Sequence, residues 1–346
     1  MRTLWIALLS VSSIGCRYEL PSVDLPVRTD GPSAKQRSWV TALPPQNPGR
    51  LFGPKLIYRE AANSVLLYGG NDPAKVPVAE AWTYDGEDWH KLCGPCPPGP
   101  RVGHGFVLDR KRGVAVLFGG NDGTAPSNDI WELEAGVWSA ASPAGTPPSP
   151  RSGAYVAYDP VRARTVVFGG IDGGGKRLND VYEYDGASWH GPFKPATRPS
   201  PRQSSGSSAT FVGAGGLAPA MREQVVIFGG EVATKTTVDD CWAWDGAGWT
   251  RICTTCTGTA RVGVALGHDP STGRLVVVNG WTGTAGIAGT IEAAGLSWSQ
   301  TTTLPSMRDN SGLVFDVARD RFVLYGGNGK PCAGNCDETL EYAFPR

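Results

Sequence analysis

Six arginines recur at similar places along this sequence of 346 residues. Each follows a tryptophan by 10 to 13 residues, and four of them open a segment that ends eight residues later in aspartate. A guanidinium group binds a carboxylate through two parallel hydrogen bonds, so six of them, if the fold brings them together, could hold an anionic ligand such as a carboxylate or sialic acid. The alternative is that each arginine ties its repeat to a neighbouring repeat through a carboxylate or a carbonyl, and its presence in every copy favours this structural role. The six are Arg50, Arg101, Arg151, Arg202, Arg261 and Arg308.

Other residues that could do chemistry are few. No two of the four histidines have the spacing of metal ligands on one element, and neither a His-Glu-x-x-His nor a Gly-x-Ser-x-Gly motif occurs. The Asn-Asp turns that follow several strands lack the dense oxygen ligands of a calcium site. We therefore predict no catalytic residue, no bound metal and no cofactor. The histidines are His90, His104, His190 and His268.

The elements that carry the arginines repeat. Six apolar runs end in two glycines, or in Asn-Gly in one case. Continuous β-branched and aromatic runs of this length are typical of strands buried on both faces. The glycines let the chain leave the strand with positive φ and pack tightly against a neighbour. The runs end at Gly70, Gly120, Gly170, Gly230, Gly280 and Gly327.

Tryptophan marks a second strand of each repeat. Tight-turn sequences such as Asp85-Gly86 precede most of these tryptophans, and the strand before the turn carries aromatic residues at alternate positions. Such turns join two strands in a hairpin. These tryptophans recur at intervals of 49 to 60 residues and are Trp39, Trp89, Trp138, Trp189, Trp249 and Trp298.

The order of these strands resembles kelch repeats: an Arg-x-Gly-His-like strand, a strand that ends in Gly-Gly, a Tyr-Asp-Gly strand and a Trp strand. The resemblance implies an all-β fold, a six-bladed kelch-type β-propeller over residues 37–346. Blade 5 is the most degenerate, and blade 4 carries an insertion from Gly213 to Ala220. In kelch proteins the arginine strand is the innermost, which implies that the arginine side chains lie near the axis at one mouth of the channel.

The two ends of the repeat region predict how the ring closes. The Trp strand is last in each repeat, yet the region begins with Ser38-Trp39-Val40 and ends after an aromatic strand that contains Tyr342. The Trp39 strand should therefore complete the last blade as its outermost strand, which leaves no long unpaired sheet edge. We expect a monomeric propeller.

Two close cysteine pairs could each supply half of a four-cysteine zinc site. The pairs Cys93/Cys96 and Cys253/Cys256 fall in the loops that join blades 1 and 2 and blades 4 and 5, on opposite sides of a six-fold ring. Local disulfides are the better interpretation for an exported protein. The seven candidates for disulfide bonds are Cys93, Cys96, Cys241, Cys253, Cys256, Cys332 and Cys336.

Cys241 complicates one of these bonds. If the Asp245 hairpin pairs Trp244 with Trp249, Cys241 lies opposite Ile252 and beside Cys253. A 241–253 bond therefore competes with a 253–256 bond, and the sequence leaves both open. Cys332 and Cys336 are expected to staple the loop of blade 6.

The first 36 residues carry export signals. Residues 1–15 resemble a signal peptide, and Ser13-Ile14-Gly15-Cys16 resembles a bacterial lipobox, with an ordinary secretory signal as the alternative. Cleavage before Cys16 would leave this cysteine lipidated, and residues 16–36 would form a tether. We expect an exported bacterial protein, either an outer-membrane lipoprotein or a periplasmic or extracellular protein, that meets the membrane only through a lipid anchor.

Charge narrows the function classes. The chain has 32 basic and 32 acidic residues, so the basic excess typical of a nucleic-acid binder is absent. The favoured class is a non-catalytic scaffold of the bacterial cell envelope that engages a protein or glycan partner through the loop faces. The alternative is a carbohydrate-active enzyme similar to the sialic acid mutarotases with kelch rings, with a site at the channel mouth. It would need an axial carboxylate opposite the arginines, for which Glu231 and Asp172 are the candidates.

Overall fold

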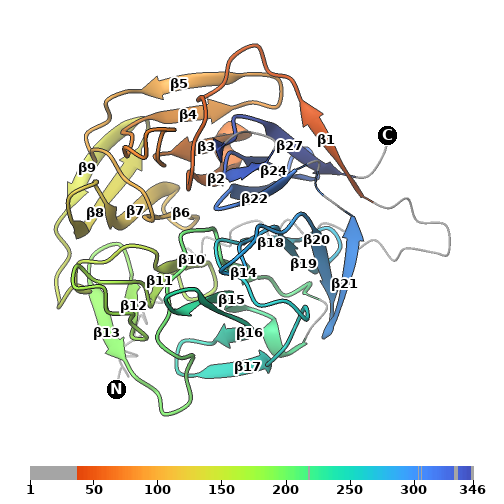
Figure 1. Ribbon diagram of the computed structural model, residues 1–346. Helices are drawn as coiled ribbons and strands as arrows, with labels where there is room; N and C mark the ends of the chain where they lie inside the picture. Colours follow the sequence, from red (N-terminus) through yellow and green to blue (C-terminus); the bar gives the residue numbers. More distant parts are fainter. Residues whose placement is uncertain (1–36, 217–218, 303, 305, 331–333, 344–346) are drawn as a thin grey trace, which may run out of the picture.

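The structure is a computed structural model that describes residues 37–216, 219–302, 304, 306–330 and 334–343. Six four-stranded antiparallel sheets surround a central axis (Figure 1), which confirms the predicted six-bladed all-β propeller. Two 3-10 turns, η1 (Glu60–Ala62) and η2 (Pro219–Met221), follow the inner strands of blades 1 and 4. Within the described ranges, no helix has the length and apolar composition that crossing a bilayer requires.

The strands of each blade run from the axis outward. Blade 1 contains β2 (Lys55–Arg59), β3 (Ser64–Tyr68), β4 (Ala81–Tyr84) and β5 (Trp89–Cys93). Blade 2 contains β6 (Gly105–Asp109), β7 (Val114–Asn121), β8 (Pro126–Glu134) and β9 (Val137–Ala141). Blade 3 contains β10 (Tyr155–Asp159), β11 (Arg164–Phe168), β12 (Val181–Tyr184) and β13 (Trp189–Phe193). Blade 4 contains β14 (Ala209–Val212), β15 (Gln224–Ala233), β16 (Thr236–Trp244) and β17 (Trp249–Cys253). Blade 5 contains β18 (Ala265–Asp269), β19 (Arg274–Val278), β20 (Thr290–Ala294) and β21 (Ser297–Thr302). Blade 6 contains β23 (Gly312–Asp316), β24 (Arg321–Tyr325), β27 (Thr339–Ala343) and β1 (Ser38–Ala42). A small sheet of β22 (Met307–Asp309), β25 (Asn328–Lys330) and β26 (Gly334–Asn335) adjoins blade 6.

The antiparallel order gives the ring two different faces. The connections between blades and the loops between second and third strands lie at one end of the sheets, which we call the loop face. The turns between first and second strands and between third and fourth strands lie at the other end, the turn face. The two faces therefore carry different loops, and each can be tested separately.

The second strand of each blade leaves the sheet with positive φ. The first glycine of each pair has a φ between 59° and 70°, and Asn279 takes the same place in blade 5 with a φ of 51°. Asparagine tolerates this left-handed region better than most side chains, so blade 5 keeps the bend without the glycine. Close packing adds a second constraint, since a Cβ on Gly119 would lie 2.9 Å from the main-chain oxygen of Arg151.

The N-terminal strand closes the ring, as the sequence predicted. β1 is the outermost strand of blade 6, where Trp39 lies opposite Tyr342 in β27. The two rings stack with centroids 4.9 Å apart. The Nε1 atom of Trp39 also donates to Oγ1 of Thr290 in blade 5 at 2.6 Å. The strand therefore ties the last two blades together.

Arg37 strengthens this closure. Its Nη2 atom lies 2.8 Å from Oδ2 of Asp269 in blade 5, and both side chains are buried. In other blades the equivalent aspartate binds an arginine three residues later, as Asp159 binds Arg162 at 2.8 Å. Blade 5 has Thr272 at that position. The closing segment thus supplies the cation that blade 5 lacks.

The loop between the first and second strands of blade 4 is longer than in blade 3, as the sequence predicted. Eleven residues separate the paired Val212 and Gln224, whereas four separate the paired Asp159 and Arg164 of blade 3. The predicted insertion from Gly213 to Ala220 falls in this longer turn-face loop, of which residues 217–218 lie outside the described ranges.

A second expansion of blade 4 lies beside the axis. The main-chain oxygen of Ser208, six positions after Arg202, accepts from the nitrogen of Phe228. The equivalent Tyr155 of blade 3 stands only four positions after Arg151. Two additional residues therefore lie in the Ser204–Ser208 segment, which the sequence did not reveal.

Candidate functional site

Arg151 shows what the recurring arginines do. Its side chain is fully buried, and its Nη1 and Nη2 atoms donate to the two carboxylate oxygens of Asp180 at 2.6 and 3.2 Å. Nη1 also donates to the main-chain oxygen of Gly169 at 3.0 Å, where the second strand leaves the sheet. The guanidinium therefore joins the start of the first strand to the second and third strands of its own blade.

Four other arginines occupy the same position. Each donates to the main-chain oxygen of the first residue of the Gly-Gly or Asn-Gly pair in its blade, at 3.1 to 3.3 Å. None is more than 7% exposed, so the guanidinium groups lie inside the blades rather than at the channel mouth. These contacts are structural, but they join strands of one blade, whereas the structural interpretation expected each arginine to tie its blade to a neighbouring blade. The pairs with acidic residues are Arg101–Asp129, Arg202–Asp240 and Arg308–Glu338, whereas Arg261 donates to Thr257 and Thr259.

Arg50 does not belong to this set, and Leu51 takes its place. The main-chain oxygen of Leu51 accepts from the nitrogen of Gly327 at 2.8 Å, as the oxygen of Arg101 accepts from Gly70 at 2.8 Å. Leu51 is buried, whereas Arg50 is exposed. The predicted ring of six arginines was therefore wrong at Arg50, because the distance from the preceding tryptophan varies between blades.

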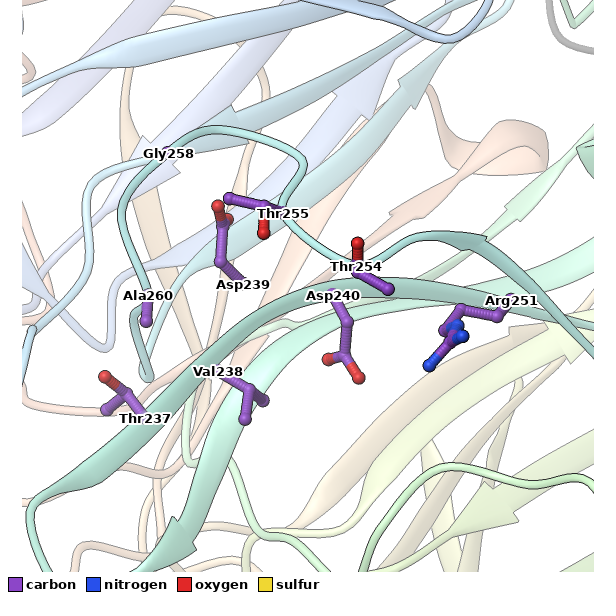
Figure 2. Close-up of a pocket in the computed structure, with 9 residues that line it drawn as sticks. All are labelled: Thr237, Val238, Asp239, Asp240, Arg251, Thr254, Thr255, Gly258 and Ala260. Carbon is purple, nitrogen blue, oxygen red and sulfur yellow. The ribbon is translucent and has the colours of Figure 1, made fainter.

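A surface pocket of about 480 Å³ lies in blade 4, between β16 and the loop after β17. Figure 2 shows its two carboxylates on opposite sides of β16, with Asp239 directed toward the loop that carries Thr255. Asp239 accepts from the nitrogen and the Oγ1 atom of Thr257 at 2.9 and 2.7 Å, and Asp240 is the partner of Arg202. Both carboxylates already hold the loop and the blade together, so we assign no ligand to this pocket.

Two of the cysteine pairs form local disulfides. Cys93 bonds Cys96 and Cys253 bonds Cys256, each with Cα atoms 5.4 Å apart. The first cysteine of each pair is the last residue of β5 or β17, and these two strands lie on opposite sides of the ring (Figure 1). Cys336 is also disulfide-bonded, whereas Cys332 lies outside the described residues.

Cys241 is a buried free thiol. A β-bulge between Cys241 and Trp242 shifts the register by one residue, so Cys241 lies opposite Cys253 and not opposite Ile252 as predicted. Burial raises the pKa of this thiol far above its ordinary value. A thiol that stays protonated is a poor nucleophile, so Cys241 is not set up for exchange with the neighbouring disulfide.

The carboxylates suggested as axial partners of the arginines have other roles. Glu231 accepts from Nε2 of Gln203 at 2.6 Å and lies 3.0 Å from Nη2 of Arg177. Burial alone would raise the pKa of Glu231, but hydrogen bonds from Gln203 and Arg177 lower it, so it stays ionised. Asp172 accepts from the nitrogen of Lys176 at 2.9 Å within its own turn. The carbohydrate-active alternative therefore finds no support among the described residues.

The histidines also have structural positions. His104 packs edge-on against Tyr68, with ring centroids 5.5 Å apart, and it is buried against the glycine bends of two blades. His90 and His190 lie within 3.0 and 2.7 Å of aspartates in their own hairpins. Across the described ranges, no three His, Cys, Asp or Glu side chains are grouped to hold a metal ion.

Two exposed apolar side chains, Trp281 of blade 5 and Met307 before blade 6, lie on adjoining segments of the loop face near the axis. Around the axial mouth, the residue that follows the glycine pair of each blade forms a β-bridge with the segment that leads into the innermost strand. In blade 5 this bridge joins Trp281, which follows Asn279-Gly280, to Val262. Trp281 also forms a bridge to Gly286, which approaches Met307 of blade 6: a Cβ on the glycine would lie 3.8 Å from the methionine Cβ. Trp281 is 36% exposed and Met307 is 44% exposed. We call these two side chains the Trp281–Met307 patch.

The sequence and the fold together define a kelch-type β-propeller. The chain matches the model of the KLHDC2/KLHL20/DRC7 Kelch-repeats domain over residues 132–327, and it belongs to this kelch-repeat family. It is also similar to the serine/threonine-protein phosphatase BSL2 of Arabidopsis thaliana, with 32% identity over 90 residues. That match covers 23% of this chain and 9% of the phosphatase, so the chain spans only a small part of this relative.

The sequence did not single out the residues that distinguish one blade from another. Trp281 stands directly after Asn279-Gly280, at a position where other blades have Asn, Ile or Glu. Lys55 is a charged residue at the start of the otherwise apolar Leu56-Ile57-Tyr58 run. Both are departures from the repeat, and comparing the blades position by position would have identified them.

Proposed function

We propose that this propeller is a non-catalytic scaffold that binds a protein partner through its loop face, with the Trp281–Met307 patch at the centre of the contact. The exposure of a tryptophan and a methionine on adjoining segments at the axial mouth carries this proposal. Both residue types are enriched in protein interfaces, and the residues that dominate binding cluster near the centre of such contacts. The patch is asymmetric on a symmetric ring, as a specific site requires.

The partner is expected in the bacterial cell envelope. The resemblance of residues 1–15 to a signal peptide and of Ser13-Ile14-Gly15-Cys16 to a lipobox supports this location. A lipid on Cys16 and a tether over residues 16–36 would hold the propeller at a membrane surface. These residues lie outside the described part of the chain, and a lipid-modified Cys16 in the mass spectrum of the purified protein would support the anchor.

Photocrosslinking tests which face binds. We expect a benzoylphenylalanine residue in place of Trp281 to capture a protein when the full chain is expressed in its native host. The control has the same residue in place of Val161, which is 61% exposed on the turn face. Capture from position 161 but not from 281 would contradict the proposal. Capture of a glycan from position 281 would replace the protein partner with a carbohydrate.

A further inference from the structure

A cavity of about 830 Å³ occupies the axis of the ring. Along the axis, the residues that line the cavity extend from the turn face, where Glu60 and Arg110 lie, to Lys55. The residues that ring the loop-face mouth, such as Val262 and Trp281, do not line it. The cavity is therefore a pocket that opens on the turn face and is closed toward the loop face.

The second expansion of blade 4 builds the closed end. The Ser204–Ser208 segment lies beside the axis, and its Gly206, Ser207 and Ser208 line the cavity. From blade 1, across the ring, Nζ of Lys55 donates to the main-chain oxygens of Ser205 and Gly206 at 2.8 and 2.6 Å. Lys55 and the expanded segment together span the axis.

Lys55 is a buried cation without a carboxylate partner. Its side chain is 6% exposed, and within the described residues its Nζ atom bonds the two carbonyl oxygens and forms no ion pair. An ammonium group has three N–H donors, so one remains for another acceptor. Burial lowers the pKa of Lys55 to about 7, which is the cost of holding this charge in an apolar site.

We propose that the axial cavity binds a small amphipathic carboxylate, with its carboxylate group on Lys55 and its hydrocarbon chain directed toward the turn face. A single ammonium matches the single charge of a carboxylate, whereas a phosphate monoester would leave part of its charge unmatched in an apolar site. The volume lies within the usual range of ligand pockets, which have apolar walls and a few polar groups that fix the ligand. The apolar walls include Leu56, Phe106, Val156, Phe211, Leu266 and Leu313.

The proposed site is independent of the protein-binding face. It opens on the turn face, whereas the Trp281–Met307 patch lies on the loop face. Failure of one proposal therefore leaves the other unaffected. Occupation of the cavity also needs no movement of Arg101, Arg151, Arg202 or Arg308, since none of these four arginines lines it.

The pH dependence of binding has a defined sign. A carboxylate binds the ammonium form of Lys55, so the pKa of the lysine is higher in the complex than in the free protein. Affinity should be greatest below the free pKa of about 7 and should fall by up to about tenfold per pH unit above it. Burial holds the pKa of His104 well below its ordinary value and lowers that of His268 to about 4, so both stay neutral over this range. Burial raises the pKa of Tyr68, so it also stays neutral.

The remaining charges near the cavity are already paired. Arg101 is bound to Asp129 beside the closed end. At the open end, Glu60 lies 3.3 Å from Arg110, and both side chains are half exposed. A loss of affinity centred near pH 7 would therefore report on Lys55.

Calorimetric titration of the full chain with sodium dodecanoate below its micelle concentration tests the proposal. We expect one bound molecule per chain at pH 6.5, and dodecan-1-ol should bind at least about tenfold more weakly because it cannot pair with the ammonium. The Lys55→Met variant should lose at least about tenfold in affinity for dodecanoate. The matched Lys91→Met variant, which changes an exposed lysine on β5, should bind as the wild type does.

Three results would overturn the proposal. These are equal affinity for the acid and the alcohol, a folded Lys55→Met variant that binds dodecanoate normally, and no binding to the wild type up to the solubility limit. If Lys55→Met does not fold, the comparison of the two ligands and the pH series on the wild-type protein decide the matter. Affinity that does not change between pH 6 and pH 9 would then exclude Lys55 as the partner of the carboxylate.

Discussion

Deletion of residues 37–43 is expected to lower the free energy of unfolding by about 5 kcal/mol or more. The deletion removes the stacked contact of Trp39 with Tyr342 and leaves the buried carboxylate of Asp269 without Arg37. Removal of a packed tryptophan and loss of one partner of a buried ion pair each cost about 3–5 kcal/mol. The deletion also leaves β27 as an unpaired edge. Urea unfolding followed by tryptophan fluorescence measures the effect.

Two further chains show whether this loss reflects ring closure. Transfer of residues 37–43 to the C-terminus through a short linker should restore most of the stability, because Ser38 lies opposite Ala343 and the two strands can form a hairpin. Val40→Ser, at a position that is 58% exposed in β1, should change stability by less than about 0.5 kcal/mol. Closure by β1 would be contradicted if the deleted chain were as stable to heat and urea as the intact one.

Arg151→Ala is expected to destabilise the propeller by about 3–5 kcal/mol. The variant leaves the carboxylate of Asp180, which is 18% exposed, without its guanidinium partner. It also removes the hydrogen bond to the oxygen of Gly169 at the strand end. The same urea unfolding measurement gives the difference from wild type.

Arg50→Ala is the matched control for this prediction. Arg50 was predicted to belong to the same ring, but it is exposed and Leu51 occupies the repeat position. Its replacement should change stability by less than about 0.5 kcal/mol. Equal effects of the two substitutions would show that burial in the blade does not determine the role of Arg151.

The repeating features of the fold could be predicted from the sequence because every blade repeats the same physical solution. The apolar runs that end in glycine predicted the second strands, and the Trp39 strand at one end of the repeat region predicted closure. A single copy of either pattern would have been ambiguous, but six copies at similar spacing are specific. In blade 5, Asn279 stands where the other blades have glycine and keeps the bend after the second strand, because asparagine adopts positive φ.

Predictions failed where one blade departs from the common spacing. Arg50 was assigned to a position that Leu51 occupies. Because blade 1 has no arginine at that position, the carboxylate of Glu80 in the same blade binds Nζ of Lys91 at 2.6 Å. The position of Cys241 was wrong by one residue because the strand contains a β-bulge that no turn residue announces. Both errors came from the assumption of a constant register.

The candidate sites could not be predicted because they depend on contacts across the ring. Lys55 and the Ser204–Ser208 segment are far apart in the sequence and meet only at the axis. Trp281 and Met307 belong to different blades and come together through the Gly286 loop. The repeat pattern specifies the frame of the propeller, whereas these asymmetric residues are where specific binding is expected.

Binding affinity of a double variant tests most directly the claim that the loop face is the functional surface. The protein captured by crosslinking at position 281 would be purified and titrated against the wild type and against the Trp281→Ser, Met307→Ser variant. We predict a loss of affinity of at least about tenfold, with an unchanged melting temperature. The control is Val161→Ser, which should bind as the wild type does. Unchanged affinity in the double variant would contradict the central role of the Trp281–Met307 patch.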